Sequence, residues 1–169
     1  MKRYKEFLWI LILFLLQTTL FARYKILGVV PNVVLVYLVG VFCVNSVPVA
    51  ALSGVFAGLM LDWMSGRAGV NALILLYLGT LVSYVSAKFF YKRLIYIVLL
   101  TFAADVLFSL TFLALNFYIW GIFVNFASFV RIFLQAAVDC ALSVICYFAY
   151  VRRRDKENAG LSFKKEVIF

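Results

Sequence analysis

Six long apolar stretches follow one another along the chain, and few polar residues separate them. A bilayer core of roughly 30 Å takes about 20 helical residues, and the stretches approach that length. None of them alternates polar and apolar residues as a strand of a membrane barrel does. The pattern predicts six transmembrane helices, at about Phe7–Ala22, Val29–Asn45, Pro48–Ser65, Ala72–Ala87 and Leu94–Leu115, and within Phe126–Val151.

The composition indicates the same class of protein. Of the 169 residues, 67% are hydrophobic and 14% charged, and the mean hydropathy is +1.09. So few charged residues do not cover the surface of a soluble domain of this size. In hydrocarbon every backbone N–H and C=O must bond within the protein, as helices allow. We therefore expect an all-α polytopic membrane protein, with a six-helix transmembrane domain at residues 1–151 and a basic cytoplasmic tail at 152–169.

Basic residues are divided unequally between the two ends of the predicted helices. The N-terminal segment, the fourth-to-fifth connection and the tail hold 12 of the 16 Lys and Arg residues. The opposite side has Arg23, Lys25 and Arg67, and Arg131 falls inside a helix. Because basic loops remain in the cytoplasm, we expect a multi-pass protein of the inner membrane with both termini cytoplasmic. The net charge of +9 then indicates contact with anionic lipid and no nucleic-acid partner.

A glycine–aspartate motif lies in the third predicted helix. Gly54, Gly58 and Asp62 are four residues apart, so they line one face of a helix. Two glycines on that face allow a neighbouring helix to approach closely. Asp62 falls near the outer end of the helix, where we expect its carboxylate to reach water or a partner.

The residues after Asp62 predict a break between two helices. Ser65 and Gly66 follow it directly, and Gly69 comes shortly afterwards. Glycine commonly ends a helix, and Asn71 can cap the next one. The combined pattern is more specific than a pair of glycines four residues apart, which by itself indicates only a tightly packed helical corner.

The order of these motifs resembles MreD, a family of small integral membrane proteins of the bacterial rod-shape (cell elongation) system. The length of the chain and the arrangement of its six predicted helices agree with the family over essentially the whole chain. The matching segments are Leu15–Gln17, the run that begins at Pro31 and Asn32, and the run from Gly54 to Leu73. Members of the family often have Asp at the position of Asn32.

The resemblance implies a function that composition cannot supply. It implies a non-enzymatic scaffold or regulatory subunit, without a cofactor, that binds the single-span periplasmic protein MreC. MreC and MreD together connect MreB filaments in the cytoplasm to the polymerase and transpeptidase of peptidoglycan synthesis. The protein's direct contacts are then expected to be an MreC-like partner and membrane lipid.

An alternative function follows from the same family. MreD proteins are similar in fold to the six-helix substrate-binding subunits of energy-coupling-factor vitamin transporters. Such a subunit needs an enclosed site to which several helices and loops bring polar groups. The predicted outer loops are short and poor in polar residues, which favours the MreD-like interpretation.

Ionisable residues inside the last two predicted helices form a second set of candidates. Asp105 and Asp139 fall near the membrane midplane, and Arg131 lies nearer the outer surface. A charge at the membrane centre costs roughly 2.5–3.5 kcal/mol on insertion scales, so each should face the protein interior or water. Arg131, Gln135, Asp139 and Ser143 are four apart and form one polar line.

We expect this polar line to face the fifth helix, where Asp105 can share a proton or a hydrogen bond with it. Two interpretations stay open. The polar groups either fix the register of the last two helices, or they line a cavity that binds a partner helix, a lipid headgroup or a small solute.

Nothing in the sequence resembles an active site. The chain has no His, and its cysteines (Cys43, Cys140 and Cys146) lie in apolar segments without metal-ligand spacing. We therefore expect neither an enzyme nor a metal protein. The uncharged, aromatic connection predicted at Asn116–Asn125 is unusual for an outer loop, and we hypothesise that it lies in the interface or contacts the periplasmic partner.

Overall fold

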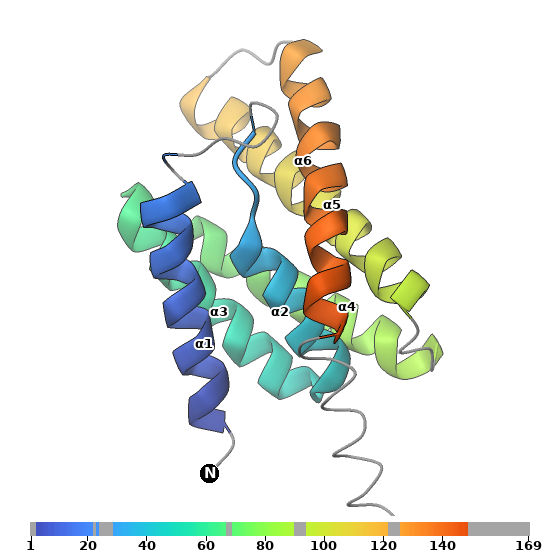
Figure 1. Cartoon of the computed structure of the whole chain (residues 1–169). Helices are drawn as coiled ribbons and strands as arrows, with labels where there is room; N and C mark the ends of the chain where they lie inside the picture. Colours follow the sequence, from blue (N-terminus) through green and yellow to red (C-terminus); the bar gives the residue numbers. More distant parts are fainter. Residues whose placement is uncertain are drawn as a thin grey trace, which may run out of the picture.

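Helices make up 92% of the residues that the computed structural model describes, which are 3–21, 23, 29–66, 69–89, 94–121 and 126–148. No strand occurs among them. The elements are α1 (Arg3–Leu16), a π-helical turn η1 (Gln17–Phe21), α2 (Val33–Val44), α3 (Val47–Ser65), α4 (Val70–Phe89), α5 (Leu94–Trp120) and α6 (Phe126–Cys146). The predicted all-α class is therefore confirmed for this part of the chain (Figure 1).

Four of the helices are long and apolar enough to cross a membrane, namely α3, α4, α5 and α6. This is the make-up of a membrane protein. The apolar part of α1 and the whole of α2 are shorter. With 12 residues, α2 is about 18 Å long, which is less than a bilayer core.

The second predicted helix begins later than expected. Val29 and Val30 precede the helix as non-helical backbone, and α2 starts only at Val33. The reason is local: Pro31 disfavours helical backbone in the residue before it, and Asn32 is the N-cap. Pro31 therefore lies outside α2, whereas the predicted range Val29–Asn45 includes it.

Helix α2 occupies the middle of the bundle. It packs against α1, α3, α4, α5 and α6, and ten of its residues, Val34 to Cys43, are buried. A helix that is apolar on all sides is suited to such a place. Its side chains Leu38 and Phe42 are among the largest that are fully buried.

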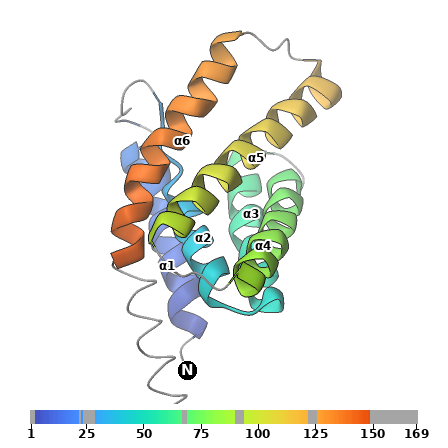
Figure 2. The ribbon, with the colours of Figure 1, turned by 90° about the vertical axis from the view of Figure 1, so that its right-hand side faces the viewer.

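Helices α5 and α6 pack against each other and extend beyond the ends of α3 and α4 (Figure 2). The connection between them is shorter than predicted, because α5 continues as a helix to Trp120. Gly121, with a φ of 61°, follows the helix. Residues 122–125 of the predicted connection, and the predicted tail at 152–169, lie outside the described residues.

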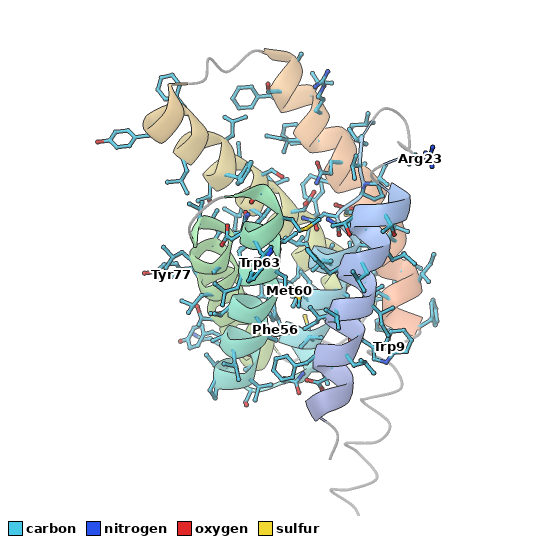
Figure 3. All side chains as sticks on the ribbon, turned by 90° about the vertical axis from the view of Figure 1, so that its left-hand side faces the viewer. Trp9, Arg23, Phe56, Met60, Trp63 and Tyr77 are labelled. Carbon is cyan, nitrogen blue, oxygen red and sulfur yellow. The ribbon has the colours of Figure 1, made fainter. Side chains whose placement is uncertain are left out.

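Apolar side chains cover much of the outer surface. Trp63 and Tyr77 point away from the bundle (Figure 3), and their exposed fractions are 89% and 69%. Phe56 lies on the side of α3 that faces α1, where its ring meets that of Phe7 edge-on at 5.1 Å. Exposed apolar surface of this extent is a feature of proteins that lipid surrounds.

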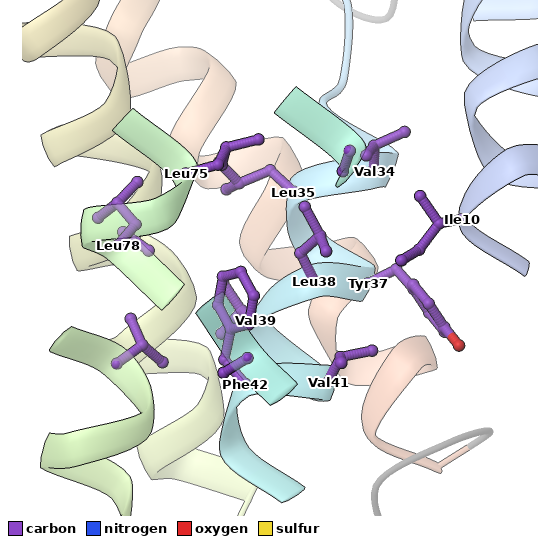
Figure 4. Close-up of a cluster of buried hydrophobic side chains, with 14 of the residues drawn as sticks. Ile10, Val34, Leu35, Tyr37, Leu38, Val39, Val41, Phe42, Leu75 and Leu78 are labelled. Carbon is purple, nitrogen blue, oxygen red and sulfur yellow. The ribbon is translucent and has the colours of Figure 1, made fainter. Parts of the chain in front are cut away.

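The interior is a continuous apolar cluster centred on α2 (Figure 4). Helix α1 contributes Ile10 and α4 contributes Leu75 and Leu78. Against this apolar background, a small number of buried polar side chains stand out. Those with carboxyl or carboxamide groups gather in two places, one with Asp62 and Asn71 and one with Asn32, Asp105 and Asp139, apart from Glu6 near the start of α1.

Candidate functional site

The first polar place is the α3–α4 corner, which we define by Gly54, Gly58, Asp62, Gly66 and Asn71. A Cβ atom added at Gly54 would collide with the backbone carbonyl of Leu75 on α4. One added at Gly58 would meet the backbone of Ala72, with the carbonyl oxygen of Asn71 at 2.7 Å. The predicted close approach of a neighbouring helix is therefore confirmed, and the neighbour is α4.

A third glycine completes this contact from the other helix. A Cβ atom at Gly79 of α4 would lie 2.9 Å from the carbonyl oxygen of Ala50 on α3. Gly79 has no second glycine four residues away, so the spacing that marks Gly54 and Gly58 is absent around it. Its position inside a predicted helix could still have indicated close packing. Glycine in a helix interior is unfavourable by about 1 kcal/mol, so its presence there calls for a packing reason.

Asp62 caps the N-terminus of α4. Its Oδ1 accepts the backbone N–H of Asn71 and its Oδ2 that of Ala72, each at 3.0 Å. These N–H groups have no partner within the helix, and the helix dipole favours a carboxylate beside them. Gly66 ends α3 in the left-handed conformation, with a φ of 64°, as its position in the sequence predicted.

Two expectations for the α3–α4 corner are corrected by this geometry. Asp62 is 4% exposed and does not reach water, because backbone N–H groups occupy both of its oxygens. Asn71 does not cap α4: it lies in the first turn, is buried, and is itself capped by Asp62. Ser65 is exposed, and its hydroxyl donates to backbone oxygens of its own helix.

The second polar place is the α2 entry site, which we define by Gln17, Asn32, Asp105 and Asp139. The backbone N–H of Asn32 donates to both oxygens of Asp139, at 2.9 and 3.2 Å. The N–H of Val34 donates to Oε1 of Gln17 at 3.0 Å. Side chains from α6 and from the end of α1 therefore satisfy the first N–H groups of α2.

The cap of α2 is completed by Asn32 itself. Its Oδ1 accepts the N–H of Leu35 at 3.3 Å and a bond from Nε2 of Gln17 at 3.4 Å. Gln17 opens the π-helical turn that follows α1, and such turns are frequent at functional sites. Three distant segments thus meet where α2 begins, and Asn32 and Asp139 are 107 positions apart in the sequence.

Asp105 of α5 lies beside Asp139, near enough for the two carboxyl groups to interact electrostatically. Both residues are 0% exposed. Unlike Asp139, Asp105 has no hydrogen-bond donor within reach of either oxygen among the described residues. Of the polar line on α6, Asp139 lies beside Asp105, whereas the expected shared proton or hydrogen bond between them stays a prediction; the hydrogen bonds of Asp139 lead to the start of α2.

The other members of the predicted polar line differ in burial. Arg131 is exposed and Gln135 is half-buried, whereas Ser143 is 1% exposed. The Ser143 hydroxyl donates to the carbonyl of Cys140 in its own helix, at 2.7 Å. Among the described residues, Asp139 is the member of this line that forms hydrogen bonds to another segment, the N-cap of α2.

Comparison with protein families, with curated proteins and with solved structures finds no significant match to this chain. Among the described residues, no three His, Cys, Asp or Glu side chains are grouped so as to hold a metal ion. The functional interpretation therefore rests on the geometry of the α3–α4 corner and of the α2 entry site.

Proposed function

We propose that the protein is an MreD-like, non-enzymatic membrane scaffold of the bacterial cell-elongation machinery. The observation that carries the proposal is that the residues of the sequence resemblance coincide with the two polar places of the fold. The glycines, Asp62 and Gly66 build the α3–α4 corner. Gln17 and Asn32 build the α2 entry site together with Asp139. Each of these residues therefore has a physical task in forming one bundle.

In this proposal all six helices cross the inner membrane and both termini are cytoplasmic. The start of α1 and the end of α6 lie at the same end of the bundle, and successive helices alternate in direction (Figure 1). Helix α1 with its π-helical turn covers Arg3–Phe21, which is long enough to approach the width of a bilayer. The non-helical residues before α2 lengthen that shorter segment.

An MreC-like periplasmic protein is the proposed partner, and the outer ends of the helices are the proposed contact. Two aromatic side chains there are almost completely exposed, Trp63 beside the α3–α4 corner at 89% and Tyr118 near the end of α5 at 88%. Large, stiff aromatic side chains commonly carry the energy of protein interfaces. We assign Trp63 and Tyr118 to the docking surface.

The test is co-expression with an MreC-like chain, followed by affinity capture in detergent. We expect capture of the wild-type protein, and weaker capture of Trp63→Ala and Tyr118→Ala. Tyr84→Ala is the matched control, because Tyr84 is 61% exposed but lies toward the other end of α4.

Three outcomes would count against this proposal in different ways. Failure to capture any MreC-like chain contradicts the scaffold function. Normal capture by both aromatic variants contradicts only the docking surface. Co-purification with the ATPase subunits of a vitamin transporter would instead support the alternative, a substrate-binding subunit.

A further inference from the structure

Two carboxyl groups meet in the interior of the bundle, and they differ in their surroundings. Asp139 accepts the N–H of Asn32 with both oxygens, at the N-terminus of α2. The helix dipole there favours a negative charge, so the charged form of Asp139 is compensated. Asp105 lies next to it without any donor among the described residues, although it is 0% exposed.

A second negative charge on Asp105 would be very unfavourable. Burial of a carboxylate without hydrogen bonds costs several kcal/mol, and the adjacent Asp139 would repel it. No other described group supplies a compensating positive charge at this point. Gln17 and Asn32, which approach from the α1 and α2 sides, do not titrate. On α6, the thiol of Cys140 is near both carboxyl groups, and Arg131 lies about two turns away and is exposed.

We propose that Asp105 and Asp139 form a proton-binding site, in which Asp105 holds the proton and donates it in a hydrogen bond to Asp139. The proton comes from bulk water and adds to one carboxylate oxygen, so the pair carries one negative charge instead of two. This single step satisfies the unpartnered Asp105 and leaves the bonds from Asn32 in place. The inference is independent of the proposed scaffold function.

The proposed proton links three helices. With the proton bound, α5 is joined through Asp105 to Asp139 of α6, and through Asp139 to the start of α2. Without it, two like charges face each other in the same apolar surroundings. Loss of the proton should therefore loosen the contact of α5 with α6 and α2.

Infrared spectroscopy of the purified full chain in lipid nanodiscs at neutral pH tests the proposal. A protonated carboxyl group gives a C=O stretch that is separate from the bands of carboxylates. We expect this band in the wild-type protein and its loss in Asp105→Asn, whose amide can still donate to Asp139. Asp62→Asn is the matched control and should keep the band, because two backbone N–H groups already satisfy Asp62.

A wild-type spectrum without the band, or a band that survives in Asp105→Asn, would overturn the proposal. A second measurement does not depend on any variant: the thermal unfolding midpoint of the wild-type protein should fall as pH rises, because the unfolded chain releases the proton. A different result would be a thermal unfolding midpoint that rises on addition of Na⁺ but not of choline, with no carboxyl C=O band in the spectrum. That result would show that the pair binds a metal cation, and it would contradict the proposed proton site.

Discussion

At the scale of the residue, Gly58 illustrates how strongly the contact between α3 and α4 depends on a missing side chain. The nearest atoms to a Cβ at this position belong to the backbone of Asn71 and Ala72, so no rotamer change can make room. The same atoms form the first turn of α4 that Asp62 caps. A larger residue would therefore disturb the packing and the cap together.

Gly58→Ala should reduce the stability of the protein by about 1–3 kcal/mol, the usual range for overpacking, and Gly58→Leu should reduce it further and impair assembly. The thermal unfolding midpoint in detergent is the measurement. Leu59→Ala serves as the control, because the neighbouring Leu59 side chain is 53% exposed. An unchanged midpoint in Gly58→Ala would mean that α3 and α4 do not pack as described.

At the scale of the element, α2 is a short helix that begins inside the bundle and takes its N-terminal caps from two other helices. Gln17 and Asp139 provide the acceptors. An unpaired N–H in a lipid-surrounded interior is unfavourable, so these side chains have a structural task whatever else they do. The α2 entry site thereby holds α1, α2 and α6 in register.

Replacing Gln17 by Leu should remove one of the caps of α2 and so destabilise the protein. The N–H of Val34 would lose its acceptor, which costs about 1–3 kcal/mol for a buried group. We expect a lower unfolding midpoint for Gln17→Leu than for Thr19→Val, because the exposed Thr19 hydroxyl donates to the carbonyl of Leu15, four residues earlier in the same segment. Equal midpoints for the two variants would show that Gln17 does not support α2.

The two polar places differ in how far sequence could predict them. The glycine face of α3 and the turn at Gly66 follow from helical periodicity and backbone sterics, which are local, and both were predicted. The bonds of Asp62 to Asn71 and Ala72 depend on how the two helices fold back on each other. The meeting of Asn32 with Asp139 depends on the complete topology, so each residue was found but their contact was not.

At the scale of the whole molecule, hydropathy located all six apolar helices, and four of them have the length of a membrane span. Two predicted boundaries differ from the structure by several residues. Helix α2 starts later than predicted because Pro31 and Asn32 precede it, and α5 ends later because no helix-breaking residue occurs before Gly121. Sidedness, by contrast, was inferred from the distribution of Lys and Arg, and it determines which aromatic residues can meet a periplasmic partner.

The most direct test of this account is the compartment in which each end of the chain lies. Reporter proteins that are active only in the cytoplasm or only in the periplasm should be fused in turn to Met1 and Phe169. We expect cytoplasmic activity, and no periplasmic activity, at both ends. Opposite compartments for the two ends would contradict an even number of crossings, and would remove both the assigned sidedness and the docking surface at Trp63 and Tyr118.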